Sequence, residues 1–269
     1  MRPNVSSTAE NINLDGVAII IPARMAAARL PGKPMAMIGD APMIVQVMRR
    51  AHEAGFGTGA SRVIVACDDQ AIADSVIAHG GEAILTSPDH PSGSDRVHEA
   101  LTVMDPEGAI EIVVNLQGDL PEIDAAMLKP LVAALRDSGA DLATPVAPAS
   151  AEEITRPQVV KAAIAFAHQP PHAGDHGRVL YFSRHAIPHG GGTEDVPIWH
   201  HVGIYAWRRD ALARFVSLPP SPLELAEKLE QLRALEDGMA ITALVVDSAP
   251  GGIDTPEDLE EARTRMESA

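Results

Sequence analysis

The feature that most constrains the fold is a short apolar run near the N-terminus, Val17–Pro22 (VAIIIP). Its residues are mostly β-branched and do not alternate with polar ones, which is typical of a strand buried on both faces of a sheet. Further short strands are predicted at 62–66, 83–86 and 110–116, and helices at 43–54, 69–79 and 124–136. Strands that alternate with helices predict crossover connections and a parallel sheet over about residues 17–145.

The pattern changes after Pro148. Strands are predicted at 159–166, 178–182 and 202–207, then a helix at 221–237, a strand at 241–246 and a helix that starts with Thr255 as N-cap and Pro256 as first residue. We therefore expect an α/β fold with a mostly parallel, Rossmann-like sheet and a smaller antiparallel excursion or lid at about 150–215. All of this is expected to form one domain over 17–266, after a disordered tail at 1–16.

Composition narrows the class of protein. The chain has 269 residues, of which 46% are hydrophobic but only 3% aromatic, so we expect a large aliphatic core. One cysteine, Cys67, excludes an intrachain disulfide. A formal charge of −16 argues against a nucleic-acid surface, and no apolar run approaches the ~20 residues that span a bilayer. We expect a soluble cytosolic protein that binds neither nucleic acid nor membrane.

A basic loop follows the first predicted strand. Arg24, Arg29 and Lys33 lie within Ile21–Pro34 (IPARMAAARLPGKP). Ligands of open α/β sheets collect at the carboxyl ends of strands, where such cations could neutralise a polyphosphate. The loop is not a P-loop, because alanine stands where its first glycine should be and proline follows the lysine. Spacing alone leaves equally open an exposed basic loop that binds nothing.

Several sequence blocks resemble those of one family. RLPGKP after a strand ending in PAR is similar to the signature loop of sugar-acid cytidylyltransferases, specifically the CMP-Kdo synthetase family. The likeness continues through SGSDR at 92–96, NLQGDLP at 115–121, YFSR at 181–184, HHVGIYAW at 200–207, SPLELAEKLEQLR at 221–233 and GIDTPEDL at 252–259. RLPGKP alone marks a wider nucleotidyltransferase group, whereas the YFSR, HVGIY and SPLE…LEQLR blocks are more specific to Kdo transfer.

The resemblance implies a nucleotidyltransferase fold with a lid or dimerisation excursion, and Mg²⁺ held by Asp119 and Asp254. Carboxylates at strand ends suit a hard cation, although a turn residue and a helix-terminus acid are the plain alternatives. One position departs from the family, which usually has Glu where this chain has Leu120. The substitution leaves open whether the chain binds its metals differently or reacts more slowly.

The resemblance also assigns nucleotide and catalytic residues. Arg96, Gln117 and the backbone around Ala23 are expected to read cytosine, while a simple helix cap near Ser92 stays an open alternative. The full nucleotide-binding set is Pro22, Ala23, Arg24, Lys33, Ser92, Gly93, Arg96 and Gln117. The catalytic set is Arg24, Arg29, Lys33, Asp119 and Asp254.

A third set is expected to bind the acid sugar. Arg184 is the candidate cation for a sugar carboxylate, with His201 and Tyr205 beside it. Glu224 and Gln231 share one side of the predicted helix at 221–237 and could bind sugar hydroxyls. Each of these residues has a structural alternative, a packed ring or a solvated helix face. The loop histidines His168, His172 and His176 lie among prolines and glycines and are interpreted as a polar loop rather than a zinc site.

Together these features predict an enzyme that transfers CMP from CTP to a Kdo-type acid sugar for lipopolysaccharide precursor synthesis. Pyrophosphate leaves, and the family implies a cytoplasmic homodimer. Two alternatives stay open: a CTP-dependent transferase for a related acid sugar, such as an amino-substituted Kdo, and a non-catalytic nucleotide-binding relative, suggested by Leu120.

Overall fold

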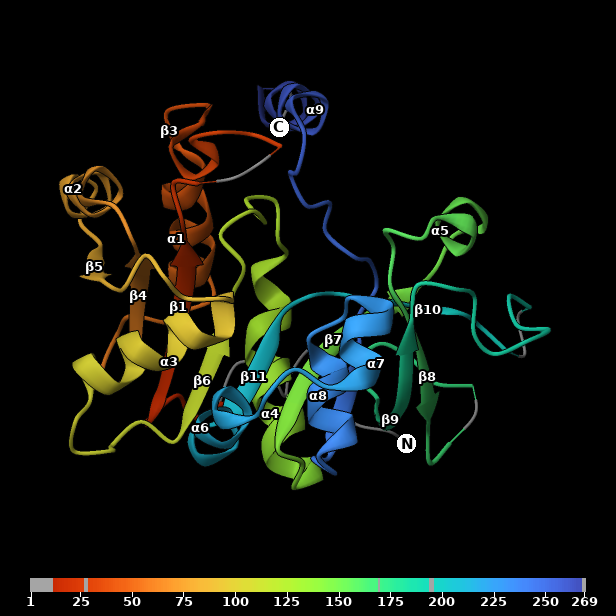
Figure 1. The fold of residues 1–269 in the computed structure, drawn as a ribbon. Helices are drawn as coiled ribbons and strands as arrows, with labels where there is room; N and C mark the ends of the chain where they lie inside the picture. The colour runs from red at the N-terminus through yellow and green to blue at the C-terminus, as the bar shows by residue number, and fades with distance from the viewer. Residues whose placement is uncertain (1–11, 27–28, 169, 194–195, 268–269) are drawn as a thin grey trace. The chain divides into compact units, whose positions relative to one another are not determined.

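The computed structural model describes residues 12–26, 29–168, 170–193 and 196–267, and the chain divides into two compact units (Figure 1). The N-terminal unit comprises Leu14–Leu128 and Pro250–Ala269, and the central unit comprises Met1–Asn13 and Lys129–Ala249. Most of the expected disordered tail, residues 1–11, lies outside the described residues. The single domain over 17–266 stays a prediction, and the observed unit boundaries differ from the excursion expected at about 150–215.

Four parallel strands form the sheet of the N-terminal unit. They are β1 (Val17–Ala23), β4 (Arg62–Cys67), β5 (Glu82–Leu85) and β6 (Ile112–Asn115), in the order β6-β1-β4-β5. Ile19 in β1 pairs with Val63 on one side and Val114 on the other. Residues Val17–Ile21 have no exposed surface, so the apolar run is the central strand that its composition predicts.

The helices of this unit set the position of the site. The chain runs outward from β1 through α1 (Met43–Glu53), β4 and α2 (Gln70–Ala78) to β5, and returns through α3 (Gly93–Met104) to β6. Because such crossovers are right-handed, α1 and α2 cover one face of the sheet and α3 the other. The direction reverses between β1 and β6, and such a switch point is where open α/β sheets bind ligands.

The end of the chain packs back on this unit. The helix α9 (Pro256–Glu267) begins as predicted, since Asp258 N–H donates to Thr255 Oγ1 at 3.2 Å and the Asp258 carboxylate accepts from the Thr255 amide at 2.8 Å. Its Leu259 and Ala262 pack with Ile38 in an apolar cluster. The remaining elements of the unit are the short 3₁₀ helices η3 (Lys33–Met35) and η4 (Ala125–Met127), and the strand pair β2 (Met37–Ile38) and β3 (Ala41–Pro42).

The central unit is mainly antiparallel. Its strands are β7 (Leu142–Pro148), β8 (Lys161–Ala165), β9 (His176–Ser183), β10 (Trp199–His201), β11 (Tyr205–Arg208) and β12 (Ile241–Val245), and its helices are α4 (Leu128–Ser138), α5 (Ala151–Thr155), α6 (Arg209–Ser217), α7 (Pro222–Glu227) and α8 (Gln231–Glu236). The strand β12 pairs with β7 in parallel, whereas the pairs β10–β7, β10–β8, β11–β7, β12–β9 and β8–β9 are antiparallel. The fold is therefore mixed α/β, and the expectation of a mostly parallel sheet for the whole chain is not confirmed. Most of these strands are joined without the crossover helix that a parallel pair needs.

Several elements of the central unit differ from the sequence prediction, which did not include α5, β10 or α6. The strand β7 was not expected, because it contains Pro145 and ends at Pro148, and proline normally argues against an inner strand. The continuous helix predicted at 221–237 is wrong. It breaks into α7 and α8 at Lys228, whose φ of 55° is left-handed. Among the described residues, no helix is both long and apolar enough to cross a membrane.

Candidate functional site

A cavity of about 370 Å³ lies within the N-terminal unit. It is bounded by the carboxyl ends of β1 and β6, the loop after β1, the first turn of α3 and the segment before α9. Its lining comprises Pro22, Ala23, Arg24, Arg29, Leu30, Lys33, Pro34, His90, Pro91, Ser92, Gly93, Arg96, Gln117, Gly118, Asp119 and Asp254. Every residue expected at the nucleotide or in the chemistry therefore lines one cavity, while the individual roles stay predictions.

Lys33 occupies the centre of the charged part of this cavity. Its Nζ donates to Asp119 Oδ2 at 2.7 Å and to Asp254 Oδ1 at 3.1 Å. Arg29 Nη2 lies 2.9 Å from the other oxygen of Asp254, in a more exposed position. The basic loop after β1 and two aspartates from distant parts of the sequence thus meet at one point.

The backbone explains how Lys33 reaches this point. Gly32 has a φ of 70°, a left-handed conformation that favours glycine, and its N–H donates to the Met25 carbonyl at 3.2 Å. That bond closes the loop just before η3 begins at Lys33. The residues on either side of Lys33 pack towards α9, because Leu30 and Ala36 lie against the buried cluster that contains Ile38, Ile253 and Leu259. One apolar cluster therefore positions both Lys33 and the neighbour of Asp254.

The cavity carries an excess of positive charge in an acidic chain. Among its lining residues, leaving His90 aside, four side chains are cationic and two are carboxylates: Arg24, Arg29, Lys33 and Arg96 against Asp119 and Asp254. The whole chain has a formal charge of −16. Partly buried cations at the end of a parallel sheet can bind phosphates through charge-assisted hydrogen bonds.

The first turn of α3 forms the opposite wall. Ser92 is the N-cap and its Oγ accepts from the amides of Ser94 and Asp95, so the helix cap left open by the sequence is present and also lines the cavity. The Arg96 side chain is only 4% exposed. Its Nη1 donates to Thr86 Oγ1 at 2.5 Å, and its Nη2 lies 3.5 Å from Asp68 Oδ2. Arg96 is therefore held in the wall rather than free in solvent.

Gly118 permits close approach of two strand ends. A Cβ at this position would lie 2.8 Å from the Pro22 carbonyl oxygen and 3.1 Å from Ile44 Cδ1. The adjoining Gln117 donates from Nε2 to Asn115 Oδ1 at 3.1 Å. A side chain at 118 would push the ends of β1 and β6 apart, which explains a glycine between Gln117 and Asp119.

The aspartate pair fits the requirements of a magnesium site. Asp119 and Asp254 direct carboxylate oxygens at one point, where the Lys33 ammonium already places a positive charge. Mg²⁺ prefers oxygen ligands and usually keeps water or substrate phosphate in its other positions, so two protein carboxylates suffice. No group of three or more His, Cys, Asp or Glu residues suited to a metal occurs in the described part of the chain. This holds for His168, His172 and His176, the histidines that the sequence pattern assigns to a polar loop.

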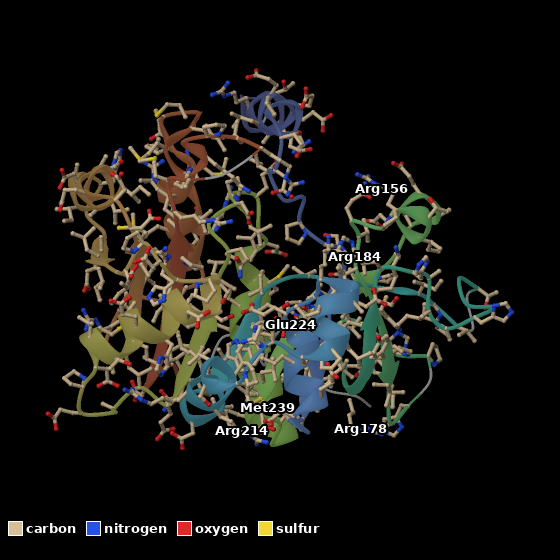
Figure 2. The ribbon with its side chains drawn as sticks, viewed as in Figure 1. Arg156, Arg178, Arg184, Arg214, Glu224 and Met239 are labelled. Carbon is tan, nitrogen blue, oxygen red and sulfur yellow. The ribbon has the colours of Figure 1, made fainter. Side chains whose placement is uncertain are left out.

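The residues expected at the sugar lie in the central unit, and Figure 2 labels two of them, Arg184 and Glu224. Arg184 donates to the carbonyls of Glu227 (2.7 Å), Pro157 (3.1 Å) and Lys228 (3.0 Å). Three of its five N–H donors are thus engaged by backbone carbonyls, two of them at the end of α7 and the third at Pro157. A sugar carboxylate could use the remaining donors, and this role stays a prediction.

His201 and Tyr205 belong to an aromatic cluster. The His201 ring centroid lies 4.7 Å from that of Phe182 and 5.6 Å from that of Tyr205. Burial lowers the pKa of His201 to about 3, with a smaller contribution from His200. Its Nε2 lies 2.9 Å from Thr144 Oγ1, whose own hydroxyl can donate to a backbone carbonyl, so Nε2 is assigned as the donor. These contacts support packing, and contact with a sugar stays a prediction.

Glu224 and Gln231 no longer share one helix, because α7 ends before Lys228 and α8 begins at Gln231. Glu224 forms a bidentate ion pair with Arg233, whose Nη2 donates to Oε1 at 2.6 Å and whose Nε donates to Oε2 at 2.8 Å. Burial alone would raise the pKa of Glu224, but the hydrogen bonds from Arg233 and the Ser221 amide outweigh it and lower the pKa. Gln231 is buried. Their proposed contacts with sugar hydroxyls are untested, and the Arg233 partner was not predicted.

Sequence reasoning missed other groups at the cavity. His90 lines it and is hydrogen-bonded through Nε2 to Glu99, a residue on α3. Asp68 lies behind the wall, beside Arg96. Their sequence signal is their position just after a strand or just before α3, where a parallel sheet brings such residues together. Cys67 is buried, and burial raises the pKa of its thiol to about 11, so it is a core thiol.

Comparison with known proteins identifies similar chains. A family model described as cytidylyltransferase matches residues 18–241. A 3-deoxy-manno-octulosonate cytidylyltransferase of a Bradyrhizobium species is 55% identical over 94% of this chain and 98% of its own. The enzyme of that name from Parvibaculum lavamentivorans is 54% identical over 92% of each. A solved CMP:2-keto-3-deoxy-manno-octonic acid synthetase complexed with CTP has a TM-score of 0.83 and 39% identity, covering 94% of this chain and 98% of that one.

Proposed function

The chain belongs to the cytidylyltransferase family, and we propose that it transfers CMP from CTP to a Kdo-type acid sugar with release of pyrophosphate. The observation that carries this proposal is the convergence of Lys33, Asp119 and Asp254 in a cavity that is also lined by Arg24, Arg29 and Arg96. Similarity to a synthetase complexed with CTP supports the nucleotide, and relatives named for 3-deoxy-manno-octulosonate support the sugar.

The chemistry follows from the charges in the cavity. The anomeric hydroxyl oxygen of the sugar attacks the α-phosphorus of CTP, and the bond from that phosphorus to the oxygen between the α and β phosphates breaks, so that this oxygen leaves with the pyrophosphate. The hydroxyl proton passes to solvent. Arg24, Arg29 and Lys33 bind the negative charge that grows on the departing pyrophosphate. Catalysis of this kind depends on positioning and charge neutralisation rather than on a strong protein base.

We propose Mg²⁺ as the cofactor, held by Asp119 and Asp254. When bound, the metal supplies positive charge at substrate oxygens and lowers the pKa of the attacking hydroxyl. Lys33 can exchange its two carboxylate partners for phosphate oxygens when a nucleotide enters, because a lysine ammonium acts as a point charge without fixed geometry.

A pyrophosphate-release assay with CTP, Mg²⁺ and Kdo tests the proposal. We expect turnover with CTP and little with UTP, ATP or GTP. The variants D119N and D254N are expected to need at least about 10-fold more Mg²⁺ for half-maximal rate, whereas D124N, which alters the cap of η4, should match wild type. Absence of turnover at high enzyme concentration would reject the assignment.

Two alternatives remain distinct outcomes of the same assay. Turnover with an amino-substituted Kdo but not with Kdo would identify a transferase for a related acid sugar. CTP binding without turnover would identify a nucleotide-binding relative. Leu120 is the observation that favours a difference from the family, because a buried, apolar side chain stands where a family member usually has a glutamate.

We further propose that the protein acts as a cytoplasmic homodimer in the synthesis of lipopolysaccharide precursors. CTP is an intracellular nucleotide, which supports the compartment, and the names of the relatives support the sugar. Light scattering of the purified protein would measure its mass against 28.4 kDa for one chain. A monomer at all concentrations would exclude the dimer.

A further inference from the structure

Asp68 connects two parts of the candidate nucleotide site. It follows β4 directly, and β4 lies between β1 and β5 in the sheet. Its Oδ1 accepts from the Met25 N–H at 3.0 Å, in the basic loop after β1. Its Oδ2 lies 3.5 Å from Nη2 of Arg96 on α3. The Asp68 side chain is 12% exposed, so these contacts are largely shielded from water.

The contact with Asp68 holds the buried guanidinium of Arg96 in place. The Arg96 side chain is 4% exposed, and Asp68 is the carboxylate that forms an ion pair with it. Removing one partner of a buried pair leaves an uncompensated charge, which is strongly unfavourable. Thr86 holds a second nitrogen of the guanidinium, and its own hydroxyl donates to the Cys67 carbonyl at 3.0 Å. The plane of the guanidinium is thus fixed from two sides.

The contact with Met25 acts on the other wall of the cavity. The Met25 amide follows Arg24, and the Met25 carbonyl accepts from Gly32, which precedes Lys33. A single carboxylate therefore holds the start of the loop that carries Arg24 and Lys33, and also orients Arg96. Fixed donors bind a ligand more tightly than mobile ones, because less conformational freedom is lost on binding.

We infer that Asp68 is a positioning residue for the nucleotide, which acts through Arg96 and the Met25 amide without touching the ligand. This inference rests on the proposed function and deepens it. The D68N variant keeps the shape of the side chain and an oxygen for the Met25 N–H, but removes the charge that pairs with Arg96. D68A removes both contacts.

The test measures CTP binding by calorimetry with Mg²⁺ present, and steady-state rates with Kdo. We expect D68N to weaken CTP binding and raise the KM for CTP about 10-fold, with kcat within about 2-fold of wild type. D69N is the matched control, since it removes the same charge one position away, where Asp69 caps α2. Thermal unfolding checks that each variant folds.

A double-mutant cycle separates positioning from a general structural effect. If Asp68 acts through Arg96, the D68N/R96Q double variant should bind CTP within about 2-fold of the R96Q variant, because R96Q removes the charge that pairs with Asp68 and each change then removes the same interaction. Equal CTP affinity of D68N and D69N, or fully additive losses in the cycle, would overturn the inference. If wild type itself fails to bind CTP, the proposed function fails instead.

Discussion

At the scale of single residues, Lys33 combines low exposure with two carboxylate partners. The variant K33M keeps much of the chain length but removes the ammonium that lies between Asp119 and Asp254. We expect kcat/KM for CTP to fall about 100-fold or more, as when a preorganised charge-stabilising donor is lost. R29M is the control, and a smaller loss is expected because the Arg29 side chain is 67% exposed. Equal losses in the two variants would contradict a central role for Lys33.

His201 leads to a prediction about pH. Its pKa is lowered to about 3 in the folded protein by burial, against an ordinary value near 6.5. The unfolded chain therefore binds a proton between these values that the folded protein does not. Stability should fall as the pH is lowered from 6.5, by at most about 1.4 kcal/mol per pH unit from this group. H201Q, which can still donate to Thr144, should lose that part of the slope in urea unfolding. An unchanged slope would show that His201 is accessible to protons.

The site could be predicted in part from single residues. The convergence of Lys33, Asp119 and Asp254 follows from their position at strand ends and from family resemblance. Asp68 was not predicted, because the adjoining Asp69 already accounts for an acid at this place as the N-cap of α2. His90 was missed because its position just before α3 does not by itself distinguish a site histidine from any other loop histidine, and its partner Glu99 lies on the following helix.

At the scale of elements, the break between α7 and α8 is held by polar contacts. Arg184 donates to carbonyls at the end of α7, and Arg233 joins α8 to Glu224 on α7. R233M would leave the Glu224 carboxylate, 12% exposed, without this partner. We expect the free energy of unfolding to drop by about 1–3 kcal/mol, measured by denaturant titration. R214M should cost less than about 1 kcal/mol, because the Arg214 side chain in its pair with Asp237 is 53% exposed. A larger loss in R214M would contradict this ranking.

Elements differ in how well the sequence predicts them. The strands β1, β4 and β6 are predictable because a fully buried strand is itself apolar along its length. The break at Lys228 is not, since its left-handed conformation accompanies contacts from Arg184, which is remote in sequence. Most of the few aromatic residues also lie in the central unit, where the rings of Trp207 and Phe215 are 4.8 Å apart. Composition of the whole chain cannot show this uneven distribution.

At the scale of the whole molecule, the net negative charge of the chain and the cationic cavity have opposite effects on the binding of CTP. A chain of charge −16 repels CTP at long range, whereas the cationic side chains of the cavity attract it at short range. We expect CTP binding to weaken when NaCl rises from about 0.05 M to about 0.5 M, because the attraction dominates binding and cations such as Arg29, whose side chain is 67% exposed, are open to screening by salt. Calorimetry would measure this, with uncharged cytidine as the control. Tighter binding at high salt would show that the acidic surface dominates.

The ion pair between Lys33 and Asp254 joins residues 221 positions apart in the sequence. Almost the entire polypeptide must therefore leave the ribosome before the acidic pair is complete. During translation, the loop after β1 emerges early and carries its cations without Asp254. The metal site that we propose at this place would therefore be complete only when the last helix docks, so we expect the growing chain to be inactive on nucleotide before the fold is complete.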